Sequence, residues 1–216
     1  MARAESRYRV LDADEAERRF ALASRSGFPY LGPARQEIRL YEGGWHVRGD
    51  LLSNFAPENR PYHVIVDGDL TVEGTLDWAT EDHPSVILVT GDLRARAVLL
   101  SGSPAAPELV VQGTLRADHG VLGYLSGPRG GRLRVAGRTE TPVVLAIEDF
   151  TMTFAHPPAA AVLGDAGSYS GPPQLALRPF DEALHENLLR ADGEPDPHET
   201  GSALAFGRPV LRAAGA

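Results

Sequence analysis

The same short phrase recurs five times between residues 45 and 139 of this chain. Each copy reads apolar residue, any residue, Val, any residue, Gly, and then usually a polar residue and Leu. The copies occupy residues 45–51, 64–70, 87–93, 109–115 and 133–139. Their glycines stand at positions 49, 68, 91, 113 and 137, so successive copies are 19 to 24 residues apart. A repeat of this length that is built from strands and turns is typical of a solenoid.

The positions of the apolar residues predict the shape of each repeat. The alternation before each glycine predicts a strand with one inward face, so these valines should stack in register: Val47, Val66, Val89, Val111 and Val135. The glycine predicts a corner, because it permits sharp bends of the backbone. A second inward position then holds Leu51, Leu70, Leu93, Leu115 and Thr139. A third apolar run follows in four copies, at residues 76–78, 98–100, 121–122 and 144–147.

Three short strands in each repeat of about 22 residues predict a mainly β fold, a parallel β-helix of about five coils with flanking capping helices. At about 4.8 Å per coil the stack would be roughly 24 Å tall. A leucine-rich repeat has a similar period, but its Leu-x-x-Leu-x-Leu-x-x-Asn phrase is missing. An antiparallel sandwich has regularly spaced turns, but it has no reason to repeat one phrase in phase. The β-helix is therefore favoured over both alternatives.

The length of 216 residues suits one domain with flanking segments. We expect residues 1–44 to form an N-terminal cap, with a helix over residues 11–23 and a lead-in strand over residues 37–42. Residues 45–155 should form the β-solenoid. Residues 156–216 should comprise a Pro- and Gly-rich loop to residue 173, a helix over residues 180–190, and a tail of low pattern from residue 194.

An apolar stripe is expected on the outer wall of the solenoid. Ile65, Leu88 and Val110 take the position that alternation predicts to point outward on successive coils. Monomers rarely leave such a stripe bare. The favoured cover is the C-terminal helix through its four-residue repeat of Phe180, Leu184 and Leu188, and a surface for self-association or for a partner is the alternative. The two helices should also cap the open ends of the stack.

Composition excludes several functional classes. The formal net charge of −8 argues against a nucleic-acid binder, whose affinity depends on neutralising phosphates. The same charge suits a basic protein partner, although acidity also simply keeps a protein soluble. No apolar window is long enough to span a bilayer, and the N-terminus lacks the apolar core of a signal peptide, so we expect a cytoplasmic protein without a membrane partner. The absence of cysteine excludes disulfides, thiolate metal sites and cysteine nucleophiles.

Asp50, Asp69 and Asp92 directly follow turn glycines and are expected to stack as an acidic ladder. Such a ladder could hold a cation, but aspartate at a turn also accepts hydrogen bonds from backbone N–H groups. Thr114 and Arg138 occupy the same position in the later copies, which favours the turn-making role. The Gly- and Asp-rich nine-residue phrase of calcium-binding β-rolls is missing.

Catalytic and cofactor signatures are not evident. The seven histidines show no recognised metal spacing. Asp118, Glu148 and Asp149 could supply a carboxylate pair for sugar hydrolysis, but any β-helix offers outward carboxylates. The chain has no Gly-x-Ser-x-Gly, no phosphate-binding loop and no dinucleotide fingerprint. The sequence therefore predicts a protein that is not an enzyme and that uses no cofactor and no metal.

The recurring phrase Val-x-Gly-Asp-Leu, present at residues 66–70 and 89–93, resembles bacterial β-helix proteins of the bactofilin type and the β-helical domain of the division inhibitor MinC. The likeness covers residues 45–155 and concerns the solenoid turns. Bactofilins are cytoskeletal proteins that polymerise end to end through uncapped helices without nucleotide, so the resemblance implies a scaffold. The helical and Pro-rich flanks of this chain depart from that pattern and predict a monomer or a small closed oligomer.

Three functional hypotheses follow. The first is a non-enzymatic solenoid that binds another protein, with toxin-neutralising immunity proteins as a concrete instance. The second is a self-assembling bactofilin-like scaffold, and the third is a carbohydrate-active β-helix enzyme. The first is favoured, and its binding determinants should combine aromatic anchors with carboxylates. The candidate residues are Asp69, Asp92, Trp78, Glu81, Asp82 and Tyr124.

Overall fold

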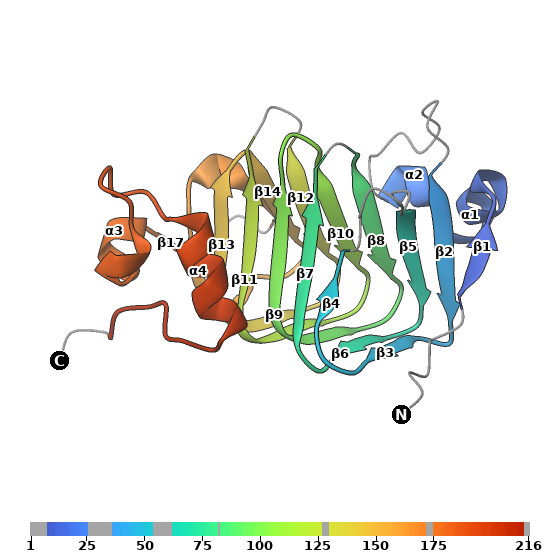
Figure 1. The fold of residues 1–216 in the computed structure, drawn as a ribbon, viewed down its shortest axis with the longest axis horizontal. Helices are drawn as coiled ribbons and strands as arrows, with labels where there is room; N and C mark the ends of the chain where they lie inside the picture. The colour runs from blue at the N-terminus through green and yellow to red at the C-terminus, as the bar shows by residue number, and fades with distance from the viewer. Residues whose placement is uncertain are drawn as a thin grey trace.

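The chain forms a parallel β-solenoid of about five coils in a computed structural model (Figure 1). The structure describes residues 8–25, 36–53, 62–81, 83–126, 130–171 and 175–213. The fold is mainly β with a few helices, which confirms the fold class predicted from the repeated phrase. Figure 1 shows α1 and β1 at one end of the stack and α3 at the opposite end.

The first sheet contains the strand that precedes each turn glycine from Gly68 onward. Its order is β1-β2-β5-β8-β10-β12-β14-β16, and all neighbours are parallel except β1, which pairs with β2 in the antiparallel direction. The strands are β1 (Arg9–Leu11), β2 (Glu37–Glu42), β5 (Tyr62–Asp67), β8 (Ser85–Val89), β10 (Pro107–Val111), β12 (Gly131–Val135), β14 (Phe150–Phe154) and β16 (Tyr169–Ser170). The lead-in strand predicted over residues 37–42 is β2.

The second sheet contains the strands that follow the corner. They are β3 (Trp45–Val47), β4 (Leu51–Leu52), β6 (Leu70–Val72), β7 (Thr75–Thr80), β9 (Leu93–Gly102), β11 (Leu115–Leu125), β13 (Thr139–Glu148), β15 (Ala159–Leu163) and β17 (Leu177–Arg178). In β9, β11 and β13 the second and third predicted strands run together as one element. A register shift between Ala117 and Gly120 marks a bulge in β11, and its pairing with β9 resumes at Gly120.

The predicted inward ladders are present from the second coil onward. Val66 pairs with Val89, Val89 with Val111, and Val111 with Val135. The third apolar run stacks in the same way, because Leu76, Val98, Val121 and Val144 are register partners in turn. All of these side chains belong to one buried cluster that fills the solenoid.

The first copy of the phrase is out of register, which corrects the alignment expected from sequence. Val47 pairs with Val72 and Leu51 with Leu76, and the partner of Val66 in the first coil is Tyr41. Strand β2 supplies the first strand of this coil, so residues 45–51 begin one corner later than the other copies. This shift explains why the first step of the repeat is shorter than the others.

The turn glycines from the second coil onward lie at equivalent corners. The backbone N–H of Gly91 donates to the carbonyl of Gly68 at 2.9 Å, and that of Gly113 donates to the carbonyl of Gly91 at 2.9 Å. Gly68 has a φ of +131°, a conformation that side chains with a Cβ rarely adopt. Gly91 is required for a different reason, because a Cβ there would collide with the Asp69 carboxylate and the Gly68 carbonyl.

The N-terminal segment covers the outer stripe, which corrects the expectation that the C-terminal helix does so. Helix α1 (Ala13–Phe20) and helix α2 (Leu22–Arg25) divide the predicted helix of residues 11–23 at Ala21, whose φ is 49°. Phe20 and Leu22 pack in one buried cluster with the three stripe residues Ile65, Leu88 and Val110. The cover is the nearest segment along the chain, and β1 fixes it to the edge of β2.

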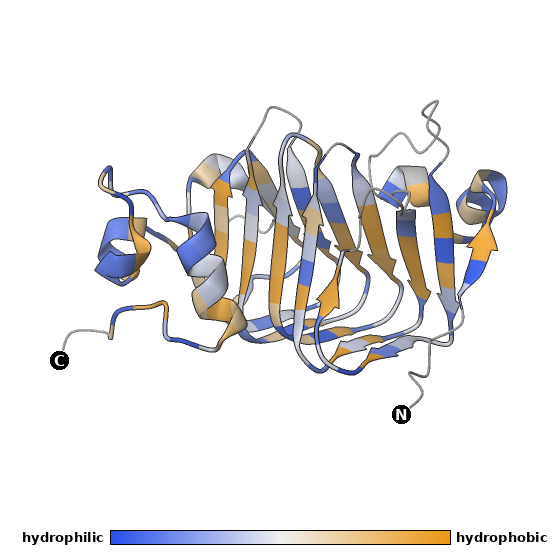
Figure 2. Cartoon of the chain, viewed as in Figure 1, coloured by the Kyte–Doolittle hydropathy of each residue, from blue (hydrophilic) through white to orange (hydrophobic). Residues whose placement is uncertain are grey.

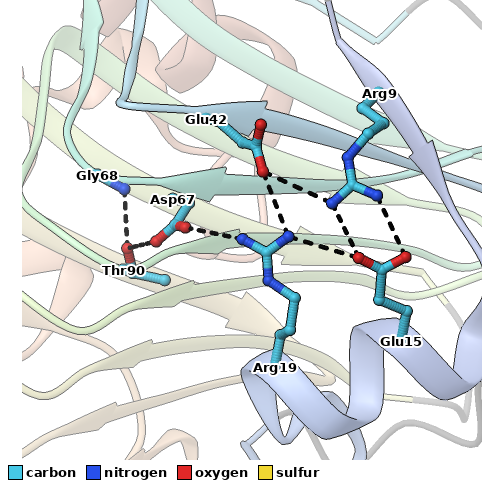
Figure 3. A network of polar contacts seen from close by, with 7 residues as sticks. All are labelled: Arg9, Glu15, Arg19, Glu42, Asp67, Gly68 and Thr90. Carbon is cyan, nitrogen blue, oxygen red and sulfur yellow. Dashed lines mark hydrogen bonds and ion pairs between the residues drawn. The ribbon is translucent and has the colours of Figure 1, made fainter.

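A network of ion pairs fixes α1 to the first corners (Figure 3). Arg19 contacts Glu42 and Asp67 at 3.3 Å and Glu15 at 3.5 Å, and Arg9 contacts Glu15 at 2.9 Å. All of these side chains are partly exposed, so each pair contributes little to stability by itself. Their joint effect is to hold the helix in one place on the stripe.

The C-terminal segment is more ordered than the sequence suggested. The parallel pairing continues on both sides of residues 45–155, through β2 before them and through β15, β16 and β17 after them. Residues 156–173, expected as a loop, therefore include two strands and the 3₁₀ turn η1 (Ala166–Ser168). The run Ala-Ala-Ala-Val-Leu over residues 159–163 supplies the apolar side chains that such a strand needs.

The helix predicted over residues 180–190 is wrong in extent. Helix α3 (Phe180–Ala183) ends where Leu184 turns to extended backbone, and a 3₁₀ turn η2 (Glu186–Leu188) follows. The tail expected to lack pattern contains helix α4 (Pro197–Ala205). The carboxylate of Asp196 accepts from the backbone N–H groups of His198 and Glu199, so this helix begins with an N-cap followed by proline.

Candidate partner-binding surface

A row of leucines crosses the outer face of the second sheet. Asp77 and Leu99 are register partners on β7 and β9, and each step in this row joins neighbouring coils. The row runs Leu52, Asp77, Leu99, Leu122, Leu145 and Leu163. We call these six residues the outer leucine row. Asp77 is its one charged member, in a position where every other coil of the row places leucine.

The C-terminal segment covers only one half of the outer leucine row. Leu122, Leu145 and Leu163 are buried in a cluster with Leu184, Leu188 and Leu204 from the C-terminal segment. Figure 1 shows α4 lying beside β11 and β13, and Figure 2 shows that hydrophobic residues run through the strands beneath it. At the other end of the row Leu52 is 58% exposed. The row therefore emerges from beneath α4 at the half-buried Leu99 and Asp77 and reaches a solvent-exposed end at Leu52.

A groove of about 540 Å³ lies where α4 meets the uncovered half of the row. The sheet contributes Asp77, Leu99, Leu100, Ser101, Leu122 and Tyr124 to its lining. Helix α4 and the residue after it contribute Pro197, His198, Gly201, Ser202, Ala205 and Phe206. Phe206 directly follows α4 at the rim of the groove and is 79% exposed, so most of its aromatic ring lies in water.

Helix α4, which forms one side of the groove, is in direct contact with the second sheet. The carbonyl of Leu204 lies 2.9 Å from Nδ1 of His119, which anchors the end of the helix to β11. A Cβ at Gly201 would lie 3.5 Å from Cδ2 of Leu122 and 3.9 Å from Cδ1 of Leu99, so the helix backbone rests close to the row. The groove is thus bounded by two elements with fixed positions.

Asp77 gives the groove its electrostatic character. Burial, together with the nearby charge of Asp50, raises the pKa of the Asp77 carboxyl above its usual range. Both causes penalise the negative charge of this carboxylate in the isolated protein. A cationic group placed beside Asp77 would remove part of this penalty.

The aspartates that follow the turn glycines have the turn-making role expected of them. Oδ1 of Asp69 accepts from the backbone N–H of Asp92 at 2.8 Å, and Oδ1 of Asp92 accepts from that of Thr114 at 2.7 Å. Asp50 does not continue this ladder, which corrects the sequence alignment: its carboxylate accepts from the N–H of Thr75 at a different corner. Asp69 and Asp92 remain exposed to solvent.

The other candidate residues lie in different environments. Trp78 is fully buried in the solenoid and meets Tyr62 edge to face at 5.7 Å, so it offers no surface to a partner and is removed from the candidates. Tyr124 is half-buried and lines the groove. Glu81 is exposed at the end of β7. Asp82 lies outside the described residues.

The carboxylates considered for sugar hydrolysis are not brought together as a set. The backbone N–H of Asp149 donates to the carbonyl of Leu125 at 3.4 Å, at the far end of β11 from Asp118. The regular strand from Gly120 to Leu125, which lies between Asp118 and this end, alone spans about 16 Å at about 3.3 Å per residue. Paired catalytic carboxyl groups in glycosidases are about 5–10 Å apart. Asp118 therefore cannot form such a pair with Glu148 or Asp149.

Within the described ranges, no group of three or more His, Cys, Asp or Glu is placed so that it could hold a metal ion. No helix in the described part of the chain has the length and apolar character needed to cross a membrane.

A second groove, of about 780 Å³, lies on the first sheet beyond α2. Its lining includes the apolar residues Val110 and Phe154 and the cationic residues Arg25 and Arg134. Nη1 of Arg134 donates to the carbonyl of Arg25 at 3.0 Å, and its Nε lies 3.9 Å from the buried carboxyl of Glu108. Arg134 is therefore already engaged with groups of this chain.

Sequence reasoning missed the outer leucine row, although its signal was present. The third apolar run of each copy is apolar at consecutive positions, as in Val98-Leu99-Leu100. Alternation assigns Val98 and Leu100 to the interior, so Leu99 must face outward. A continuous apolar run indicates a strand covered on both faces. Asp77 stands out only once this row has been recognised.

The sheets, the inward ladders and the terminal covers define the class: the chain is a parallel β-solenoid with helices on its outer faces. No protein-family model matches the chain, and no curated protein or solved structure matches it significantly.

Proposed function

We propose that this protein is a non-enzymatic, cytoplasmic β-solenoid that binds another protein through the groove beside α4. The observation that carries the proposal is the half-buried carboxylate of Asp77 in an otherwise leucine row, within a groove that is also lined by the exposed Phe206. The groove combines apolar side chains, one carboxylate and an exposed aromatic ring. The centres of protein interfaces are likewise mainly apolar, rich in aromatic residues and poor in charged ones. Tyr124 remains a candidate contact within the groove, and Asp69, Asp92 and Glu81 add exposed negative charge.

The partner in this proposal is basic. The chain carries a net charge of −8, and complementary charge speeds association and rejects wrong partners. A toxin-neutralising immunity protein is one concrete instance of such a module. The likeness of the Val-x-Gly-Asp-Leu phrase to bactofilins and to the MinC β-helical domain supports the alternative, a self-assembling scaffold.

Affinity capture from a native lysate of the source cells tests the proposal. The tagged protein is compared with Phe206→Ser, in the groove, and with Val10→Ser, which alters a residue that is 56% exposed on β1. We expect one protein to be retained by the parent and by Val10→Ser and to be lost with Phe206→Ser. Equal retention by all three, or enrichment of nothing above the bare resin, contradicts the proposal. Filaments of the purified protein in electron micrographs would favour the scaffold.

A further inference from the structure

We infer that the occupant of the groove is a basic amphipathic α-helix of the partner protein, which lies beside α4 and places one lysine or arginine against Asp77. This inference rests on the proposed function and specifies the chemistry of the partner. Three features support it: the width of the exposed strip, the backbone hydrogen bonds beside it, and the carboxylate of Asp77.

The uncovered strip has the width of one helix. From Leu52 to Leu99 the outer leucine row crosses two inter-strand spacings, which is about 9.6 Å. An α-helix with its side chains is about 10–12 Å across. The adjoining strip is already occupied by α4, which packs on β11 and β9. A second helix would lie over β4 and β7, meet α4 above Leu99, and so extend the layer that α4 begins.

Between β4 and β7 the backbone groups are already paired at this level, so a peptide cannot insert there as an added strand. The N–H of Ser53 donates to the carbonyl of Asp77 at 3.0 Å, and the N–H of Ala79 donates to Oγ of Ser53 at 3.0 Å. A peptide that binds by strand addition needs such groups unpaired. A helix satisfies its own backbone hydrogen bonds and needs only an apolar surface from its host.

Charge complementarity selects a basic helix. The groove is lined mainly by apolar side chains, and Asp77 is the carboxylate within it. A helix that presents leucines at i, i+3 and i+7 would cover Leu99 and Tyr124, but it would bury Asp77 without a partner unless it also carried a cation there. Removing an unpaired carboxylate from water is costly, whereas pairing it with lysine or arginine offsets that cost.

Synthetic helical peptides provide the test with the intact protein. The probe is a 14-residue peptide with a leucine stripe and one central lysine, and its matched control carries glutamate in place of that lysine. Binding is measured by fluorescence anisotropy with the parent, Asp77→Asn, Asp77→Lys and Glu186→Gln. Glu186→Gln removes one negative charge from a side chain that is 90% exposed and lies outside the groove lining. Thermal melting checks that each variant is folded.

We expect the lysine peptide to bind the parent and Glu186→Gln equally and to bind Asp77→Asn about tenfold more weakly, a change of about 1.4 kcal/mol. The glutamate peptide should bind Asp77→Lys better than it binds the parent. Equal binding of both peptides to the parent, or no binding of the lysine peptide at millimolar concentration, overturns the inference.

The native partner distinguishes this inference from the proposed function. If that partner is lost with Phe206→Ser but retained in full by Asp77→Asn, the groove binds a protein and the basic helix is wrong. If a second copy of this chain fills the groove, sedimentation will show a dimer that Phe206→Ser dissociates, and that result also overturns the inference.

Discussion

The carboxylate of Asp69 accepts a hydrogen bond from the backbone N–H of Asp92 at 2.8 Å and so joins the corners of two successive coils. Asp92 makes the same bond to Thr114 at 2.7 Å. The residue after each of these glycines is therefore a structural connector, although its side chain is exposed. Charge reversal at Asp69 or Asp92 would break these bonds as well as change the surface charge.

The first prediction compares two replacements of Asp69. Asp69→Ala should lower the free energy of unfolding by about 1 kcal/mol, because it leaves the N–H of Asp92 without its acceptor. Asp69→Asn keeps an oxygen in the same place and should lower it much less. Urea denaturation of both variants measures the difference. An equal loss in the two variants would mean that the charge of Asp69, and not its acceptor oxygen, stabilises the corner.

The second prediction concerns Gly91, where alanine should destabilise the protein by about 1–3 kcal/mol through steric overlap. The methyl group would collide with Oδ1 of Asp69 and with the carbonyl of Gly68. Because the Gly68 backbone also blocks it, the double variant Asp69→Ala, Gly91→Ala should remain at least as unstable as Gly91→Ala alone. Thermal melting checks this, and recovery of parental stability in the double variant would contradict it.

The repeated phrase predicted the solenoid because each coil buries side chains at the same positions, so the same apolar residues and glycine recur in every repeat. The ladder of Val66, Val89 and Val111 and the corners at Gly68 and Gly91 could be identified from spacing alone. The first copy could not be aligned correctly from sequence. Residues 45–51 fit the repeated phrase, but they lie one corner later in their coil than the other copies do and pair with residues 70–76. Tyr41, which takes the place of valine in that coil, lies outside any repeated motif.

The covers of the outer faces could not be assigned from sequence, because a stripe does not specify which segment packs on it. The row of Phe180, Leu184 and Leu188 suggested a helix for the stripe of Ile65, Leu88 and Val110. In the structure Leu184 and Leu188 pack instead on the second sheet, and they do so from outside α3. Asp77 gained its significance only from the leucines that the register places on either side of it.

The third prediction is that α1 protects the stripe from self-association. Phe20 is 4% exposed, and Phe20→Ala should cost about 3 kcal/mol through loss of packing against the stripe. The parent should sediment as a monomer or a small closed oligomer, and Phe20→Ala should associate as its concentration rises. The control is Arg18→Ala, which changes an exposed residue of the same helix. Sedimentation of Phe20→Ala identical to that of the parent would contradict this role of α1.

Two buried titratable groups on the outer face of the first sheet should have opposite effects on stability. Burial raises the pKa of Glu108 to about 7, against the opposing charges of Arg134 and Arg132. Burial lowers the pKa of His63 to about 4, and Nδ1 of His63 accepts from the backbone N–H of Val86 at 3.3 Å. Glu108 is thus favoured in its protonated form and His63 in its neutral form.

The fourth prediction is that Glu108→Gln steepens the loss of stability in acid. Between pH 4.5 and 7 the stability supplied by Glu108 falls as pH rises, because the folded state holds the proton that the unfolded state releases. Between pH 4 and 6.5 the stability supplied by His63 rises with pH, so the two effects oppose each other. Glu108→Gln should raise the free energy of unfolding by about 2–3 kcal/mol at pH 8. Below pH 6.5 the loss of stability caused by protonation of His63 would then no longer be offset by Glu108. Urea denaturation at pH 8, 6.5 and 5 checks this, with the exposed Glu186→Gln as control. Parallel curves for Glu108→Gln and the parent would show that Glu108 titrates normally.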